Sequence, residues 1–374
     1  MYCKRVELKN FRNIESCSVN FCDGINILIG ENAQGKTNLL EAVFYASVGR
    51  SFRASASNEM ISFGKRNATV SIDYMSDKKE KGDNITIQLF SDKKKTVEKN
   101  HLRVERLSDI VGSFRSVLFC PEHLSLIKDG PLERRTYLDI AISRISPKYI
   151  YALQRYSYFL KQRNALIKSA QRDRSIFDAT IELWSEKLAH EAAEISFYRL
   201  NFIKRVANIV SNCFEEMTGK KESVEIIYRG SASLSDEEYL DKELVEKKYM
   251  SLLSSAYERE IILGSTLYGI HKDDIEIKIN SKNARSFASQ GQQRSLALAL
   301  KLAEGEICYE EFGDYPVFLF DDVLSELDET RRDFMIRFAT GKQVIITTCE
   351  MAVIEKLSAD KRILVKNGTY EEIK

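Results

Sequence analysis

Apolar and polar positions along the chain divide it into three zones. From the start to about residue 120, short apolar or alternating runs predict β-strands, namely KRVELKN, INILIG, TVSIDYM, NITIQLF and SVLF. The charged stretches 76–83 and 91–96 separate some of these runs and are typical of solvated turns. The first zone is therefore expected to be rich in β-sheet.

Helical periodicity dominates from about residue 121 to 285. In the stretch 175–218, apolar residues recur at steps of three, four or seven, which indicates one long amphipathic helix. Its apolar stripe consists of Trp184, Leu188, Ala192, Ile195, Phe202, Val206, Val210, Cys213 and Met217. The run 148–172 is predicted to be the helix that covers this stripe. Together the two helices indicate a helical arm or hairpin.

Helices and strands alternate from about residue 286 to the end. The predicted helices are LALALKLAEGEICYEEF and TRRDFMIRFA, and the predicted strands are PVFLF, QVIITT and RILVKNG. Alternation of this kind implies a parallel sheet with crossover helices. The expected fold class is therefore α/β, with an additional helical lobe.

Composition excludes several classes of protein. Lysine plus arginine (56) and aspartate plus glutamate (55) nearly cancel, so any surface that binds nucleic acid must be local. Seven cysteines without a C-x-x-C pair fit reduced thiols and argue against a disulfide framework or a zinc site. No apolar run approaches about 18 residues, and charges occur within the first five. We expect a cytoplasmic protein with no signal peptide and no membrane span.

The strongest chemical motif lies between the strand INILIG and the helix LLEAVFYA. It reads Gly30, Glu31, Asn32, Ala33, Gln34, Gly35, Lys36 and Thr37, which matches the P-loop pattern in strand–loop–helix context. The glycines let backbone N–H groups point at phosphate oxygens, and the helix N-terminus adds its dipole. Lys36 is expected on the β- and γ-phosphates, and Thr37 on Mg²⁺. The sequence therefore predicts an ATP site.

The strand PVFLFDD (316–322) ends in two aspartates, as does the second acidic motif of P-loop proteins. Asp321 is expected to hold Mg²⁺, and Asp322 to orient or deprotonate the attacking water. Thr37 and Asp321 are 284 positions apart, far more than a compact P-loop domain needs. We therefore predict a discontinuous ATP-binding lobe of residues 1–120 and 286–374, interrupted by a helical lobe of residues 121–285.

Small neutral polar residues precede the helix that starts near residue 290: Ser289, Gln290, Gly291 and Gln292. A helix N-terminus attracts anions, so this segment is a candidate for a second phosphate contact. An ordinary cap by Ser289 is the alternative. In SELDETRR (325–332), Asp328 either caps a helix and pairs with Arg331 or Arg332, or has a functional role.

The predicted helix 148–172 is basic. Its cationic residues are Lys148, Arg155, Lys161, Arg163, Lys168 and Arg172, with no acidic residue among them and with tyrosines interleaved. Contact with DNA phosphates and an ordinary solvated face are equally good interpretations.

The segments GENAQGKT, SQGQQRS, VFLFDD and SELD, in this order, resemble the ABC-type ATPase heads of SMC-like proteins. The opening segment VELKNFRNI is similar to theirs. PEHLSLIKDGPLERRTYLD, FLKQRN and GIHKDD narrow the resemblance, over nearly the whole chain, to the RecF family of bacterial recombination-repair proteins. Where that family usually has aspartate, proline and arginine, this chain has His123, Ile270 and Lys272.

This resemblance implies an ABC-type head whose signature motif (289–294) lies at the base of the helical lobe. It implies ATP-dependent homodimers on duplex DNA near single-strand gaps, acting with RecR and RecO to load RecA. It also implies slow, DNA-stimulated ATP hydrolysis. By the resemblance, Arg12 and Asn13 would line the nucleotide, Ser289, Gly291 and Gln292 would reach the γ-phosphate held by the partner subunit, and Asp328 would lie at the dimer seam.

Transporter ATPases of this class usually carry a histidine after the strand that corresponds to QVIITT. Here Thr347, Thr348 and Cys349 occupy these positions, so that histidine switch is absent or replaced. Two other functions stay open: a nucleotide-binding subunit of a transporter, which the arm 148–218 fits poorly, and an ATP-binding scaffold without turnover. A DNA-clamping ATPase switch is the leading expectation.

Overall fold

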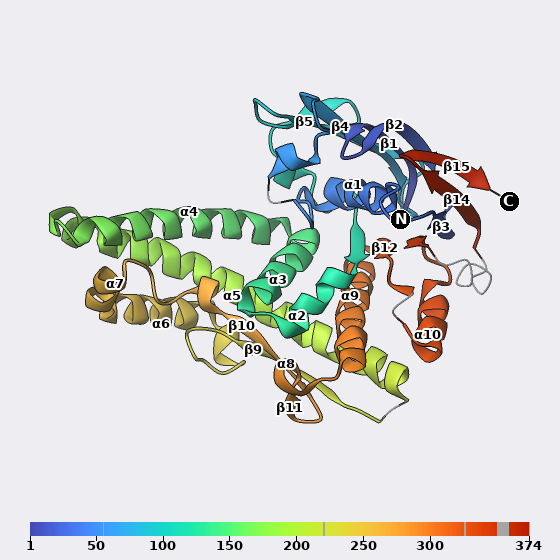
Figure 1. Cartoon of the computed structure of the whole chain (residues 1–374). Helices are drawn as coiled ribbons and strands as arrows, with labels where there is room; N and C mark the ends of the chain where they lie inside the picture. The colour runs from blue at the N-terminus through green and yellow to red at the C-terminus, as the bar shows by residue number, and fades with distance from the viewer. Residues whose placement is uncertain (55, 220, 325–326, 350–358, 374) are drawn as a thin grey trace. The chain divides into compact units, whose positions relative to one another are not determined.

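The computed structural model describes residues 1–374 apart from 55, 220, 325–326, 350–358 and 374. By their internal contacts the residues form two units. Unit 1 comprises Met1–Leu124, Asn212–Lys221 and Gln290–Lys374, and unit 2 comprises Ser125–Ser211 and Glu222–Ser289. Figure 1 labels most of the helices and strands of both units. Unit 1 is thus assembled from three separate stretches of the chain.

Unit 1 contains an antiparallel sheet with the strand order β2-β1-β4-β5-β6-β7. Its strands are β1 (Tyr2–Phe11), β2 (Ile14–Asn20), β4 (Asn67–Met75), β5 (Asp83–Phe90), β6 (Thr96–Lys99) and β7 (Leu102–Val104). Alternate residues of β4 are buried, as expected for a sheet with one face on the core. The strands predicted from KRVELKN, TVSIDYM and NITIQLF are confirmed.

The second sheet of unit 1 has the order β15-β14-β3-β13-β12-β8. It consists of β3 (Ile25–Ile29), β8 (Ser116–Phe119), β12 (Val317–Asp321), β13 (Val344–Thr348), β14 (Lys361–Lys366) and β15 (Thr369–Ile373). All neighbours pair in parallel except β14 and β15, which form an antiparallel hairpin. The predicted parallel sheet is therefore confirmed, and β3, which precedes the P-loop, lies between β13 and β14.

Helix α1 (Lys36–Val48) contacts strands of both sheets and lies between them (Figure 1). Nearly all of its residues are buried, because a helix covered on several sides has no polar face. The helix starts after Gly35 and ends at Gly49, and both glycines have left-handed backbone angles. α1, which begins directly after the P-loop, is thus packed between two sheets.

Helices α9 (Gln290–Phe312) and α10 (Glu329–Ala339) complete unit 1. The sequence places the return to the ATP-binding lobe near residue 286, and in the structure the chain rejoins unit 1 at Gln290. Packing holds the helix there: α9 contacts β8, and a Cβ at Gly305 would come within 2.2 Å of the Phe318 ring. This close approach of helix to strand fixes α9 in the same unit as the P-loop.

A helical arm is formed by α4 (Pro147–Ala170) and α5 (Ser175–Thr218), which belong to unit 2 as far as Ser211; the end of α5 belongs to unit 1. Ring contacts join Tyr149 to Tyr198 and Phe159 to Trp184, so partner numbers fall along α5 as they rise along α4. The two helices are therefore antiparallel (Figure 1), and the predicted arm is confirmed.

The other elements of unit 2 are shorter. The helices are α2 (Ser125–Lys128), α3 (Pro131–Ile145), α6 (Lys242–Ser255), α7 (Tyr257–Leu263) and α8 (Ala284–Phe287). A three-stranded sheet has the order β11-β10-β9, with β9 (Val224–Arg229), β10 (Asp274–Ile279) and β11 (Lys282–Asn283). Because α3 contacts β10, this sheet and the helices share one core.

A network of buried polar side chains lies at the centre of unit 2. Arg199, only 1% exposed, donates to Asp273 at 3.2 Å, to Asp139 at 2.8 Å and to the Tyr149 hydroxyl at 3.1 Å. Asp273 also accepts a hydrogen bond from Tyr228. A buried charge is tolerable only when its partners satisfy it, as they do here. The GIHKDD segment therefore supplies a structural anchor through Asp273.

His271, from the same segment, is held neutral in this core. Its Nδ1 lies 2.7 Å from the Tyr156 hydroxyl and its Nε2 lies 3.2 Å from the carbonyl oxygen of Thr266. Burial lowers the pKa of His271 from 6.5 to about 4.

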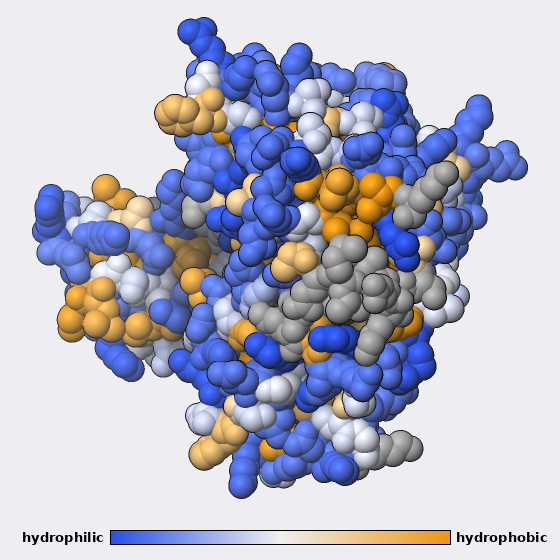
Figure 2. Space-filling model, turned by 45° about the vertical axis from the view of Figure 1, so that its right-hand side comes forward, coloured by the Kyte–Doolittle hydropathy of each residue, from blue (hydrophilic) through white to orange (hydrophobic). Residues whose placement is uncertain are grey.

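Figure 2 shows a mostly hydrophilic face of the molecule. Within the described residues, no helix combines the length and the apolar character that crossing a bilayer requires. All seven cysteines are free thiols.

The neutral state of His271 predicts a pH-dependent stability. Between pH 4 and 6.5 the unfolded chain binds a proton that the folded chain does not, so the free energy of unfolding falls as pH is lowered through this window. Urea unfolding should show a dependence steeper by up to about 1.4 kcal/mol per pH unit in the wild type than in His271→Gln. The exposed residue His190, replaced by glutamine, is the control. Equal slopes for wild type and His271→Gln would contradict the assignment.

Candidate nucleotide-binding site

The P-loop connects β3 to α1, and its backbone carbonyl groups contact the side chain of its own lysine, Lys36. The Nζ of Lys36 donates to the carbonyl oxygens of Gly30 at 2.5 Å and Glu31 at 2.8 Å, and Lys36 is 7% exposed. Glu31, Asn32 and Ala33 form the exposed part of the loop. The ammonium group therefore lies inside the curve of the loop, where a phosphate would supply stronger acceptors than these carbonyls.

The β14–β15 hairpin braces the loop from one side. A Cβ at Gly30 would lie 2.3 Å from the carbonyl oxygen of Val365, so only glycine fits there. The backbone N–H of Asn367 donates to the Gln34 side chain at 2.6 Å, and Tyr370 donates to the carbonyl oxygen of Gly35 at 3.0 Å. Gly35 itself has φ 116°, which favours glycine. The loop conformation is thus fixed by tertiary contacts.

Thr37, in the first turn of α1, meets Asp321 at the carboxyl end of β12. The Thr37 hydroxyl donates to Asp321 Oδ1 at 2.9 Å, and the Thr347 hydroxyl donates to the same oxygen at 2.8 Å. Burial raises the pKa of Asp321, the two hydroxyl donors act against this rise, and nearby Glu122 and Asp322 add to it. A buried carboxyl destabilised in its charged form is a site that a cation would favour.

Asp322 follows Asp321 in a left-handed backbone conformation, with φ 53°. Such a conformation is uncommon for a residue with a side chain and turns the chain sharply at the strand end. The Asp322 N–H donates to the Thr347 hydroxyl at 2.9 Å. The two successive aspartates therefore leave the strand in different directions, which is what separate roles would require.

The residues present fit Mg²⁺ with a nucleotide. Mg²⁺ is usually held by one or two protein oxygens, substrate phosphates and water, and an all-protein cage is rare. Thr37 and Asp321 supply two such oxygens 2.9 Å apart. In the described part of the chain, no cluster of three or more histidine, cysteine or acidic side chains forms a cage. The donor set therefore suits a metal that is shared with phosphate.

Arg12 and Asn13 follow β1 and lie beside the P-loop helix. Arg12 forms a two-pronged bond to Glu41 of α1, at 2.9 and 2.7 Å, and this hydrogen bonding raises the pKa of the guanidinium. Asn13 donates to the carbonyl oxygen of Ala33 at 3.2 Å and accepts from Asn38 at 2.7 Å. Asn13 thus contacts the P-loop directly, whereas Arg12 is anchored on the buried face of α1.

Ser289 and Gln290 are exposed at the start of α9, and Gly291 and Gln292 are half-buried. The Ser295 hydroxyl donates to the carbonyl oxygen of Gly291 at 3.0 Å, inside the first turns of the helix. The first residues of the signature motif therefore remain at the surface, where another molecule can reach them.

Asp328 caps α10, since its carboxylate accepts the Arg331 N–H at 3.0 Å. Of the two arginines considered from the sequence, Arg331 pairs with Asp328. Arg331 Nε also donates to the Ser295 hydroxyl at 2.5 Å. One arginine thus links Asp328 to the signature helix α9. Ser325 and Glu326 of the same motif lie outside the described residues.

The four residues of α4 predicted to contact DNA differ in their surroundings. Arg163 is 0% exposed and pairs with Glu260 at 2.6 Å, so the prediction that it contacts DNA is wrong. Arg155 pairs with Glu191 at 2.5 Å, which offsets its charge. Lys161 and Lys168 are exposed. Sequence reasoning missed Arg163's burial because Glu260, its partner, lies 97 residues away.

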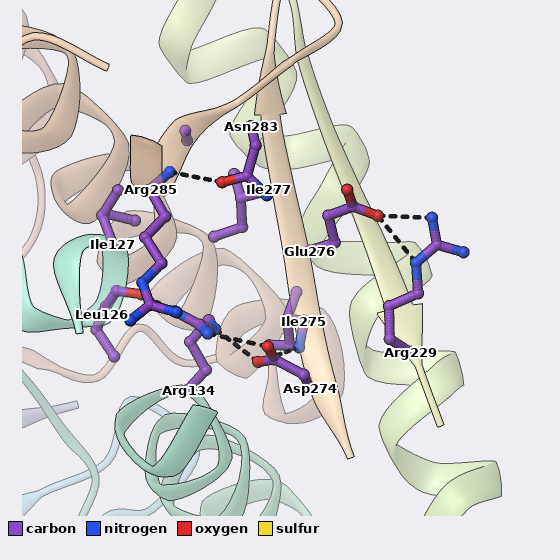
Figure 3. A pocket seen from close by; sticks show the side chains of 11 residues that line it. Leu126, Ile127, Arg134, Arg229, Asp274, Ile275, Glu276, Ile277, Asn283 and Arg285 are labelled. Atoms are coloured by element: carbon purple, nitrogen blue, oxygen red, sulfur yellow. Dashed lines mark hydrogen bonds and ion pairs between the residues drawn. The ribbon is translucent and has the colours of Figure 1, made fainter. Parts of the chain in front are cut away.

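Unit 2 contains a cavity of about 270 Å³ beside β10 (Figure 3). Four of its charged side chains form two pairs: Arg134 binds Asp274 at 2.6 and 2.9 Å, and Arg229 binds Glu276 at 2.6 and 2.9 Å. The fifth, Arg285, donates to the carbonyl oxygen of Lys128 at 3.2 Å. The residues that match the nucleotide-binding motifs lie in unit 1.

Two parts of the site were not predicted. From the sequence, Thr347 is only a residue at a position where a histidine is absent. Its place near the end of a predicted strand that neighbours the strand of Asp321 could have indicated that it lies beside that carboxylate. The hydrogen bond from Tyr370 to Gly35 cannot be recognised in the sequence, because the two residues are 335 positions apart.

Comparison with known proteins extends this picture. The family model RecF/RecN/SMC N terminal domain matches residues 2–371. The chain is 38% identical to the DNA replication and repair protein RecF of Ruminiclostridium cellulolyticum, over 93% of this chain and 92% of that one. It is 37% identical to the RecF of Clostridium novyi over 100% of both chains.

Solved structures agree in fold over the full length. Two structures described as the recombination mediator protein RecF in the RecFOR pathway, one with ATPrS and one with ATP, align with TM-scores of 0.93 and 0.91. Both are 34% identical to this chain, cover 100% of it, and are covered over 98% and 99% of their own length. The Smc head domain of Pyrococcus furiosus aligns at a TM-score of 0.57 with 19% identity, covering 100% of this chain and 96% of that one, and shares the fold.

Proposed function

The chain belongs to the RecF family of DNA replication and repair proteins, and from this premise we propose that it is an ATP-dependent DNA-binding switch of recombinational repair. The observation that carries the proposal is the bond of 2.9 Å between Thr37 and Asp321, which joins the P-loop to the acidic strand. Membership in this family argues against a transporter subunit.

In the proposed site, the loop from Gly30 to Gly35 wraps the triphosphate with its N–H groups, and Lys36 binds the β- and γ-phosphates. Thr37 and Asp321 would hold Mg²⁺, and the bound metal would neutralise phosphate charge. Asp322 orients or deprotonates water. Asn13 supports the loop at Ala33. ATP hydrolysis is proposed to be slow and stimulated by DNA, as the family resemblance implies.

We propose further that ATP joins two copies of the chain. The P-loop covers one side of a triphosphate, and the exposed start of α9 at Ser289 and Gln290 offers the other side to a second copy. Asp328, tied to α9 through Arg331, would lie at this seam. Because only ATP carries the γ-phosphate, the dimer should form with ATP and dissociate with ADP.

The proposed substrate surface is duplex DNA at gaps or junctions, and the proposed partners are RecO and RecR in loading RecA. Support comes from the family and from the RecFOR pathway named for the two most similar solved structures described above. Exposed cations on α4, such as Lys161 and Lys168, are the proposed phosphate contacts.

Replacing Lys36 by methionine tests the nucleotide site and the DNA switch together. Loss of a charge-assisted contact should weaken ATP binding about 10- to 100-fold while the fold survives. Gel shifts with gapped duplex should show ATP-dependent binding for the wild type and none for Lys36→Met. Single-turnover phosphate release distinguishes a switch from a scaffold without turnover. Wild-type ATP affinity in Lys36→Met would refute the assignment.

The dimer is tested by Ser289→Arg, whose bulk should block the seam and leave the P-loop intact. We expect monomeric ATP binding to stay within about twofold of wild type, because no P-loop contact is lost. Light scattering should show no ATP-dependent dimer. Ser254→Arg, at an exposed position of α6, is the control for an added arginine. A Ser289→Arg dimer with ATP, or a wild-type dimer of equal amount with ADP, would exclude this model.

The α4 surface is tested by removing the exposed lysines Lys148, Lys161 and Lys168 together as glutamines. Each lost phosphate contact should reduce the slope of log affinity against log salt by about 0.9. Lys247 and Lys248, exposed on α6, serve as the matched control when replaced in the same way. If the slope of the triple variant equals that of the control, α4 is an ordinary solvated face.

A further inference from the structure

Thr347 is the penultimate residue of strand β13, which lies between the strand that leads into the P-loop and the strand that ends in Asp321. In the sheet it is paired with Asp321 on one side and with Leu28 on the other. Residues paired in register point to the same face of a sheet, so the Thr347 side chain lies beside the Asp321 carboxylate. Thr347 is 1% exposed. Its position is thus set by the sheet register and is closed to solvent.

The hydroxyl of Thr347 bonds to both aspartates at once. It donates to Asp321 Oδ1 at 2.8 Å and accepts the backbone N–H of Asp322 at 2.9 Å. A threonine hydroxyl has one donor hydrogen and two acceptor lone pairs, so the two bonds are compatible. A single oxygen atom therefore links the side chain of one aspartate to the backbone of the next.

The bond to Asp322 acts where the backbone is strained. Asp322 has φ 53°, a left-handed conformation that is unfavourable for a residue with a side chain. Such conformations persist only when surrounding contacts enforce them. Thr347 supplies one such contact, because it holds the N–H of the turn in place.

Asp321 Oδ1 accepts a second hydrogen bond, from the Thr37 hydroxyl at 2.9 Å. Under the proposed function, the Thr37 oxygen would also bind Mg²⁺ through a lone pair. Of these two hydroxyl donors to the carboxylate, Thr347 would then be the one with no contact to the metal. Outer partners of this kind commonly orient the metal ligand.

We infer that Thr347 is a positioning residue that sets the Asp321 carboxylate for Mg²⁺ and the Asp322 turn for hydrolysis. The inference rests on the proposed function of the site. It assigns Thr347 no contact with nucleotide or metal. It predicts that the hydroxyl matters, and that the volume of the side chain does not.

Three variants test this inference. Thr347→Val removes the hydroxyl and keeps the shape, whereas Thr347→Ser keeps the hydroxyl. Thr348→Val removes a hydroxyl from an equally buried neighbour whose side chain points to the other face of the strand. Binding of a fluorescent ATP analogue is measured without Mg²⁺ and across a Mg²⁺ titration, and phosphate release is measured in a single turnover.

We expect Thr347→Val to bind the analogue without Mg²⁺ as the wild type does, because the P-loop is unchanged. It should need about 10- to 100-fold more Mg²⁺ for the same increase in affinity for the analogue. It should also release phosphate more slowly by a similar factor. Thr347→Ser should recover most of both losses, and Thr348→Val should show neither. If Thr347→Val does not fold, Thr347→Ala takes its place in the same comparison.

The inference is overturned if Thr347→Val matches the wild type in Mg²⁺ dependence and phosphate release. It is also overturned if Thr347→Ser is as impaired as Thr347→Val, since the hydroxyl would then not be the cause, or if Thr348→Val shows the same loss. A wild-type protein that binds no ATP, or no gapped duplex with ATP, would instead refute the proposed function. The two failures are therefore distinguishable.

Discussion

The contact between Thr37 and Asp321 is the constraint on which the rest of the molecule depends. It joins residues 284 positions apart, so the chain between them must return with the carboxyl end of β12 close to the start of α1. The parallel sheet achieves this return: β3, β13 and β12 are neighbours in register, and their carboxyl ends meet at one edge. Closing so long a loop costs little more entropy than closing a short one, because the cost grows only with the logarithm of its length. A separate folded unit can therefore be inserted between the two halves of the site.

Unit 2 shows a different use of charge. Arg163 with Glu260 and Arg199 with Asp273 are buried ion pairs whose partners come from distant parts of the chain. Such pairs add little net stability over apolar packing, but removing one partner leaves a charge that is costly to bury. They therefore favour the correct assembly of unit 2. The arginines of α4 and α5 find their carboxylate partners only when the segments around residues 260 and 273 have packed against these helices.

Much of this arrangement could be predicted from the sequence, because its signals are local. The run INILI, the P-loop spacing and the strand ending in Asp321 each read from a few adjacent residues, and all three take the predicted form. What could not be predicted depends on pairing across the chain. The burial of Arg163, the brace from Tyr370 and the two bonds of Thr347 follow from which segments become neighbours. A basic residue in a helix looks alike in the sequence whether it faces water or a buried glutamate.

The brace that the β14–β15 hairpin gives the P-loop has a consequence for how the protein is made. Synthesis proceeds from the N-terminus, so Gln34 emerges long before Asn367, its partner 333 positions later. Until then the loop has β3 and α1 beside it but lacks the backbone of the hairpin, against which Gly30 packs. A growing chain thus carries a complete phosphate-binding motif without the support that shapes it. The P-loop can therefore take the shape described above only after the β14–β15 hairpin has paired with β3.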